Sequence, residues 1–128
     1  MSEKYNLTPV EFELMEILWK IKQGTVRDVM AHLPKNRDLA YTSVSTILRI
    51  LQQKKIISAE KISGRQHIYI PALDKTKFAT HSVNKIVSQV FSGSSVEMVA
   101  HLMNKTNLTE QDLNAIQKLL DARKKELA

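Results

Sequence analysis

Apolar residues recur with a helical period through the first half of the chain, and they predict a series of helices. The segment 8–11 reads Thr-Pro-Val-Glu, in which an N-cap threonine, an early proline and a glutamate three residues after the cap are typical of a helix start. The helix that begins there is strongly apolar and is expected to end before Gly24. A second, short helix is expected over 26–33, because Thr25 can cap it and Pro34 cannot continue it.

A third helix, predicted over roughly 41–55, has two different faces. Its apolar residues recur at i, i+3, i+4 and i+7 and mark a face that packs against a core; they are Val44, Ile47, Leu48 and Leu51. The opposite face carries hydroxyl groups, an amide and one arginine; its residues are Thr42, Ser45, Thr46, Arg49 and Gln53. Because this face has no acidic residue, it can donate hydrogen bonds to an anionic partner without repelling it.

After Lys55 the period of the apolar residues falls to about two, which is typical of strands. Strands are predicted over 57–62 and 66–70, with the sequence Ser-Gly-Arg at 63–65 as the connecting turn and Pro71 as the end of the second strand. Three helices followed by a hairpin within about 70 residues is the order of a winged helix-turn-helix.

The rest of the chain is again helical in pattern. Helices are expected over 74–91, 96–103 and from Thr109 to about Leu127, since capping sequences and glycine or asparagine separate them. The predicted fold class is therefore mainly α with a small antiparallel β wing. A winged helix-turn-helix DNA-binding domain over residues 1–73 would precede a three-helix dimerisation segment over residues 74–128.

The C-terminal segment presents more apolar side chains than its roughly 55 residues can bury alone. A second copy of the same segment is the simplest partner, which predicts a homodimer. The residues expected at this contact are Phe78, Ile86, Val90, Phe91, Val99, Leu113, Ile116 and Leu120. The alternative is that the three helices fold back on the winged helix of their own chain.

Charge is concentrated in one part of the chain. The 128 residues contain 19 Lys and Arg against 13 Asp and Glu, and the formal net charge is +6. Within 35–73 there are seven basic residues and two acidic ones. The predicted third helix and hairpin therefore hold most of the positive charge, which makes a polyanion the first partner to consider.

Double-stranded DNA is the partner that this distribution favours. Short hydroxyl side chains suit base edges, Arg49 comes late in its helix and suits a phosphate, and Arg65 at the tip of a wing suits the backbone or the minor groove. The residues expected to contact DNA are Thr42, Ser43, Ser45, Thr46, Arg49, Lys54 and Arg65. A winged-helix module that binds proteins, with the basic stretch only increasing solubility, is the alternative.

Catalysis, cofactors and metals are not expected. The chain has no cysteine, three glycines and four histidines without the spacing of a ligand pair. His81 and His101 could meet in the folded C-terminal segment and bind a metal, but partly buried or surface histidines are the favoured interpretation. A small metal-dependent enzyme is the least favoured class. The residues 1–5 contain no apolar leader core and no stretch is long enough to span a membrane, so a cytoplasmic protein is expected.

Three segments together resemble the penicillinase repressor family (BlaI/MecI/CopY type). They read Leu-Met-Glu-Ile-Leu-Trp at 14–19, Ser-Val-Ser-Thr-Ile-Leu-Arg-Ile-Leu at 43–51 and Ile-Tyr-Ile-Pro at 68–71. The turn at 91–94, Phe-Ser-Gly-Ser, falls where family members turn between dimerisation helices. The resemblance covers nearly the whole chain and implies a homodimeric repressor on a pseudo-palindromic operator, often with TACA and TGTA half-sites.

The resemblance also implies two routes of induction, from which this sequence departs. In relatives, a sensor protease cuts an Asn-Phe bond in the dimerisation segment, or copper binds C-terminal cysteines. Here the matching bond is His101-Leu102, and there is no cysteine. The inducing signal stays open, and a sensor protease or a ligand is a candidate partner. Thr42 also stands where relatives often have Lys, so the operator sequence can differ.

Overall fold

The computed structural model describes residues 6–128 and divides the chain into two compact units between Val83 and Asn84. The predicted absence of an apolar leader core concerns residues 1–5, which lie outside the described part. No helix among the described residues has the length and apolarity to cross a membrane.

The first unit begins with three helices, α1 (Pro9–Ile21), α2 (Val26–Ala31) and α3 (Tyr41–Gln53). Threonines cap the first two as the sequence predicts: the Thr8 and Thr25 hydroxyls each accept from the backbone N–H three residues on, at 3.1 Å. The reciprocal bonds from the cap backbone to the glutamate or aspartate at that position are also present. The start of each helix is thus fixed locally, because these side chains accept hydrogen bonds from the first backbone N–H groups of the helix.

The core of this unit lies between α1, α3 and the base of the hairpin. The apolar stripe of α3 is fully buried at Val44, Leu48 and Leu51, where it meets Leu14 and Leu18 of α1. Ile47 is partly buried against the same cluster. Burying this stripe leaves the polar stripes of α3 at the surface.

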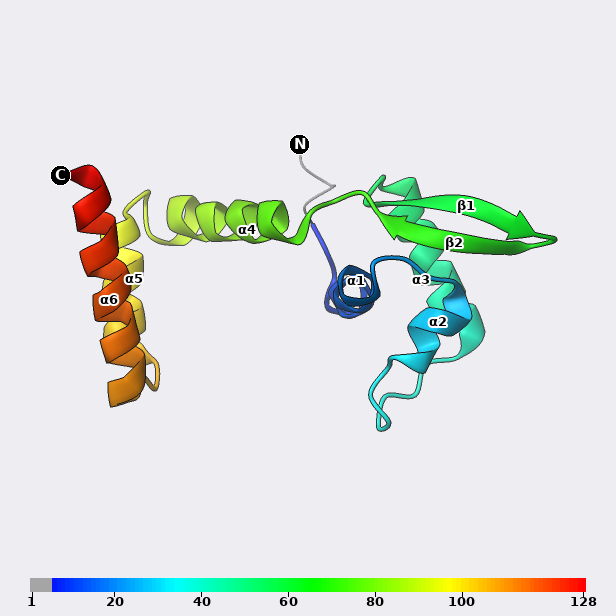
Figure 1. The fold of residues 1–128 in the computed structure, drawn as a ribbon, viewed down its shortest axis with the longest axis horizontal. Helices are drawn as coiled ribbons and strands as arrows, with labels where there is room; N and C mark the ends of the chain where they lie inside the picture. Colours follow the sequence, from blue (N-terminus) through cyan, green and yellow to red (C-terminus); the bar gives the residue numbers. More distant parts are fainter. Residues whose placement is uncertain (1–5) are drawn as a thin grey trace. The chain divides into compact units, whose positions relative to one another are not determined.

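The wing is an antiparallel hairpin of β1 (Ile57–Ser63) and β2 (Gln66–Pro71) (Figure 1). Its register is regular from the base to the pair Lys61 and His67, and a bulge follows at Ile62. At the base, Tyr69 exchanges two backbone hydrogen bonds with Gly24, at 2.7 and 3.1 Å. The connection between α1 and α2 therefore holds the wing in place beside α3.

An aromatic cluster joins the start of α4 (Lys75–Val90) to α1. The ring of Phe78 lies 5.7 Å from Phe12 and 6.0 Å from Trp19, centroid to centroid. The indole Nε1 of Trp19 donates to the backbone carbonyl of Leu73 at 2.8 Å. The end of the wing predicts a domain boundary after residue 73. The first compact unit extends ten residues farther, to Val83.

The second unit contains the end of α4, then α5 (Ser95–Lys105) and α6 (Glu110–Leu127). Ser94 and Thr109 cap the last two helices. The rings of Phe91 and His101 lie 5.6 Å apart, centroid to centroid, in an edge-to-face arrangement. The predicted fold class, mainly α with a small antiparallel wing, is confirmed; the fold is a winged helix followed by further helices.

Candidate nucleic-acid interface

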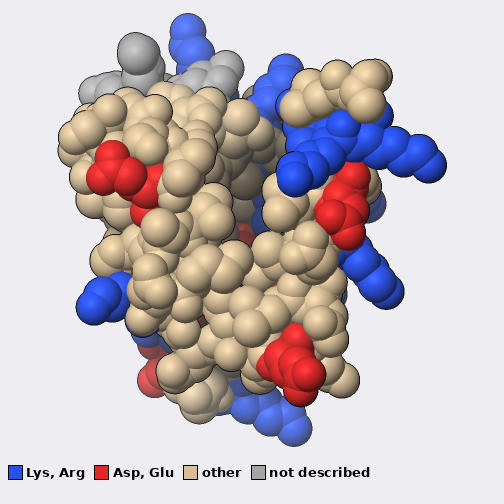
Figure 2. All heavy atoms as spheres, turned by 90° about the vertical axis from the view of Figure 1, so that its left-hand side faces the viewer, with Lys and Arg blue, Asp and Glu red and all other residues tan. Residues whose placement is uncertain are grey.

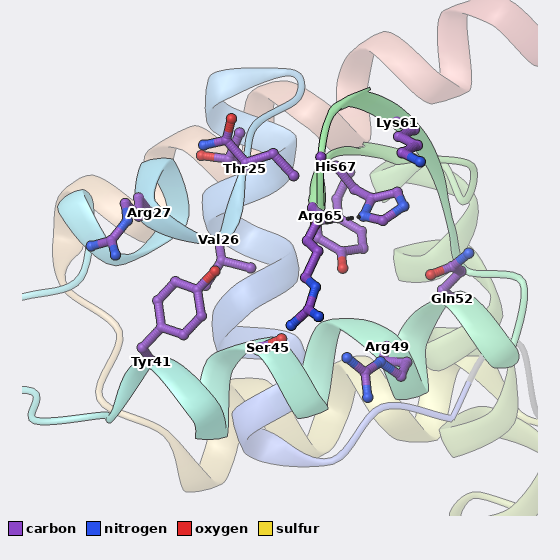
Figure 3. A pocket seen from close by; sticks show the side chains of 13 residues that line it. Thr25, Val26, Arg27, Tyr41, Ser45, Arg49, Gln52, Lys61, Arg65 and His67 are labelled. Atoms are coloured by element: carbon purple, nitrogen blue, oxygen red, sulfur yellow. Dashed lines mark hydrogen bonds between the residues drawn. The ribbon is translucent and has the colours of Figure 1, made fainter.

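A cavity of about 380 Å³ lies between α3 and the wing, with the start of α2 at one end (Figure 3). Its basic lining residues are Arg27, Arg49, Lys61, Arg65 and His67, and its other polar ones include Tyr41, Ser45 and Gln52. None of the described residues that line it is acidic. We call this cavity the cationic groove.

One wall of the cationic groove is a single stripe of α3. Tyr41, Ser45, Arg49 and Gln52 recur at i, i+4, i+8 and i+11, so they lie along one side of the helix. The neighbouring stripe, Val44, Leu48 and Leu51, is buried, and this fixes the rotation of α3 about its axis. The apolar pattern of the helix therefore determines which polar residues face the wing.

The opposite wall comes from one face of the wing. Lys61 and His67 are paired across the strands, and Tyr69, two residues after His67, is buried on the same face. The Nδ1 atom of His67 lies 3.2 Å from the carbonyl oxygen of Arg65. A carbonyl only accepts, so this contact is a hydrogen bond in the tautomer that protonates Nδ1, and it then holds the imidazole at the hairpin tip.

Arg65 extends from the wing toward Ser45 of α3 (Figure 3). Gly64, which precedes it, has a φ of +53°, a conformation that glycine adopts without a steric penalty. The tight turn at the tip thus places a guanidinium group over the cationic groove, where the sequence predicted only an exposed contact.

At the other end, the guanidinium of Arg27 lies 5.1 Å from the centre of the Tyr41 ring. This cation–π contact joins the start of α2 to the first residue of α3. Arg27 and Tyr41 were not among the predicted site residues. Their juxtaposition depends on the packing of two helices, which periodicity along one helix does not reveal.

The remaining predicted contact residues of α3 lie outside the cationic groove. Thr42, Ser43 and Thr46 are exposed on the outer side of the helix, away from the wing-facing stripe. Lys54 has a different position: its ammonium group lies 2.9 Å from both carboxylate oxygens of the buried Glu11. Lys54 is thus engaged by the cap of α1.

The cationic groove can bind an extended anion. Four Lys and Arg side chains on three different elements surround it, and their charges are not offset by an acid in its lining. A phosphate chain that passes between α3 and the wing would meet donors on both sides. The short exposed hydroxyls on the outer side of α3 would then lie next to the same ligand.

A second surface lies on the other unit. No side chain of α5 or α6 is fully buried, although both helices carry many large apolar residues. Val96, Leu119 and Leu127 are exposed by 78%, 71% and 74%. Figure 2, seen from the side of α5 and α6, shows a surface formed largely by uncharged residues.

Most of the predicted dimerisation residues belong to this surface. Those that are exposed are Ile86, Val90, Val99, Leu113 and Leu120, while Phe91 and Ile116 are half-buried. Phe78, in contrast, packs against Phe12 and Trp19 within the first unit. The structure therefore brings together seven of these residues in one unit and places the eighth elsewhere.

Comparison with known proteins gives consistent matches along the chain. The family model described as penicillinase repressor matches residues 7–122. The penicillinase repressor of Bacillus licheniformis is 23% identical over 124 residues, covering 97% of this chain and 96% of that protein. The transcriptional regulator BlaI of Mycobacterium tuberculosis is 30% identical over 114 residues, covering 88% of this chain and 82% of that protein.

Among solved structures, the DNA-binding domain of the repressor BlaI is similar with a TM-score of 0.51 and 25% identity. The match covers 59% of this chain and 92% of that domain. It supports the winged-helix assignment of the first unit.

Proposed function

The chain belongs to the penicillinase repressor family, and we propose that it acts as a homodimer that binds a pseudo-palindromic DNA operator through its cationic groove. Members of this family are transcriptional regulators and not enzymes, and this chain is a repressor with a DNA-binding domain.

The observation that carries the proposal is the acid-free lining of the cationic groove. Arg27, Arg49, Lys61 and Arg65 come from α2, α3 and the wing and surround one cavity. Each DNA strand carries one phosphate charge per about 3.4 Å of helix axis, so a backbone that follows this groove would engage several of these side chains. Thr42, Ser43 and Thr46 would then enter the major groove, where base edges are read.

Lys54 and Phe78 are left out of the proposed contacts. Lys54 is already paired with Glu11, and Phe78 already has aromatic partners in its own unit. The proposed dimer contact is formed by Ile86, Val90, Phe91, Val99, Leu113, Ile116 and Leu120, whose apolar surface is left largely uncovered in the single chain. A two-fold dimer places two winged helices on two half-sites, which is the reason for a palindromic operator. Such a repressor would work in the cytoplasm, where bacterial DNA is located.

The test is the salt dependence of DNA binding by the full-length chain. Affinity for a random-sequence duplex is measured by fluorescence anisotropy between about 50 and 200 mM salt. Four phosphate contacts per protomer predict a log–log slope of about −3.6 for one protomer and about −7 for a dimer. A winged-helix module that binds only proteins would show no DNA binding with such a slope, and that result would refute the proposal.

A further inference from the structure

Helix α3 exposes two different polar stripes, and the cationic groove uses only one of them. The outer stripe consists of Thr42, Ser43, Thr46, Ile50 and Gln53, all exposed and all uncharged. It is bordered by Arg49, which faces the wing. If Arg49 on the groove-facing stripe holds a DNA phosphate, the outer stripe would lie against the floor of the neighbouring major groove.

Ile50 is unusual on this outer stripe. It is an aliphatic residue with 38% of its surface exposed, while Ile47, one turn earlier, packs against the core. Ile50 follows Thr46 by four residues, so the two side chains are neighbours on the surface of the helix. Together they present methyl groups beside the cationic groove. At such a position a helix face that only meets water more often carries a charged residue.

The floor of the major groove has one apolar group, the 5-methyl group of thymine. Cytosine, guanine and adenine present hydrogen-bonding atoms there, which an isoleucine cannot satisfy. Thymine also presents its O4 acceptor there, but it is the base whose edge offers a methyl group, so an exposed aliphatic side chain in the major groove is best matched by thymine.

We propose that Ile50, with the methyl group of Thr46, recognises the 5-methyl group of thymine in each half-site. This inference rests on the proposed function, since it requires that α3 enters the major groove. It makes Ile50 a specificity-determining residue that the hydrophobic pattern alone does not identify, because an isolated exposed isoleucine at the surface is common.

The experiment first selects duplexes from a random pool with the full-length protein and derives the preferred sequence. Each thymine of that duplex is then replaced singly by deoxyuridine, which keeps every hydrogen-bonding atom and removes only the methyl group. Loss of one buried methyl contact is expected to weaken binding about fourfold, and about fifteenfold when the methyl is removed from both half-sites.

Ile50→Ala tests the residue itself. This variant should bind the thymine and deoxyuridine duplexes with similar affinity at the sensitive position, whereas Ile50→Val should keep most of the difference. Ile62→Ala is the matched control, because Ile62 is also an exposed isoleucine, at 51%, but lies on the wing. It should leave the thymine preference unchanged.

The outcomes separate the two hypotheses. If no sequence is enriched and binding lacks a salt slope, the proposed function fails. If a sequence is enriched but no deoxyuridine replacement weakens binding, the role of Ile50 is refuted while the repressor function stands. A deoxyuridine penalty that persists unchanged in Ile50→Ala shows that the methyl group is recognised without Ile50, by Thr46 alone or through DNA shape, and it also refutes the role of Ile50.

Discussion

Lys54 Nζ lies 2.9 Å from both carboxylate oxygens of Glu11, whose Oε1 also accepts from the backbone N–H of Thr8 at 2.9 Å. Glu11 is only 5% exposed, so these donors replace most of the water that would otherwise solvate its carboxylate oxygens. The Glu11 carboxylate thus binds both Lys54, the C-cap of α3, and Thr8, the N-cap of α1.

We expect Lys54→Met to lower the free energy of unfolding by about 1–3 kcal/mol, because a buried carboxylate loses its charged donor. Urea denaturation followed by the fluorescence of Trp19 measures this. The control is Lys55→Met at the exposed neighbouring position. The same variant tests the sequence-based prediction that Lys54 contacts DNA: we expect the salt slope to be unchanged, whereas a phosphate contact would reduce it by about one per protomer.

The two exposed stripes of α3 predict different effects on DNA binding. Thr46→Ala should reduce the preference for the operator over random DNA by about 1–3 kcal/mol at one base pair of each half-site, since it removes a group at a base edge. Arg49→Ala should weaken binding to both DNAs alike and reduce the salt slope. Anisotropy titrations with the selected duplex and a scrambled one measure both effects. An unchanged ratio of affinities in Thr46→Ala would show that Thr46 does not read a base.

Local signals in the sequence were sufficient for the elements of the fold. The caps at Thr8, Thr25 and Thr109 depend on residues three positions away, and the buried stripe of α3 depends on spacing within one helix. The family resemblance was likewise carried by short segments. Each of these features can be identified before any long-range contact is known.

Contacts between distant residues could not be predicted in the same way. Lys54 is among the residues expected to contact DNA, but its partner Glu11 is 43 residues away along the chain. Arg27 reaches the cationic groove only because α2 packs on α3 and its guanidinium meets Tyr41. Lys61 and His67 are not among the predicted contact residues, although strand alternation with the buried Tyr69 places His67 on the inner face of the wing.

The position of Phe78 predicts where the first unit can be cut. A fragment ending at residue 73 loses Phe78 and uncovers Phe12 and Trp19, whereas a fragment ending at residue 83 keeps the cluster. We expect the longer fragment to be the more stable by about 2–4 kcal/mol, near the cost of removing a buried aromatic side chain. Thermal unfolding monitored by Trp19 fluorescence compares them. Equal stability would show that the cluster contributes little, and Phe78→Ala in the longer fragment should reproduce the loss.

The apolar surface of α6 predicts how the dimer can be disrupted. Leu113, Ile116 and Leu120 lie on one side of the helix, and an aspartate in the middle of a dimer contact would be buried without a partner. Leu120→Asp should therefore convert a dimer at micromolar concentration into a monomer, measured by sedimentation. Ala122→Asp adds the same charge on the opposite side of α6 and should leave the dimer intact. A wild-type monomer at this concentration, or equal effects of the two variants, would contradict the proposed contact.

Resistance to a family sensor protease is the last expectation, and it concerns the bond between His101 and Leu102. This bond lies inside α5, and the His101 ring contacts Phe91, so the helix must open before any protease can hold the segment in an extended form. The resemblance implies cleavage of an Asn-Phe bond in relatives, and a pocket suited to an amide and an aromatic ring would lose contacts with His and Leu. We expect co-expression with an activated sensor protease of the family to leave this chain mostly intact.

The double variant His101→Asn, Leu102→Phe should be cut severalfold faster, into two fragments divided after residue 101. The single variant Leu102→Phe serves as the control for the aromatic ring alone. Rapid cleavage of the unaltered chain at this bond would show that residue identity does not protect it, and antibiotic sensing would then become the leading hypothesis for its induction.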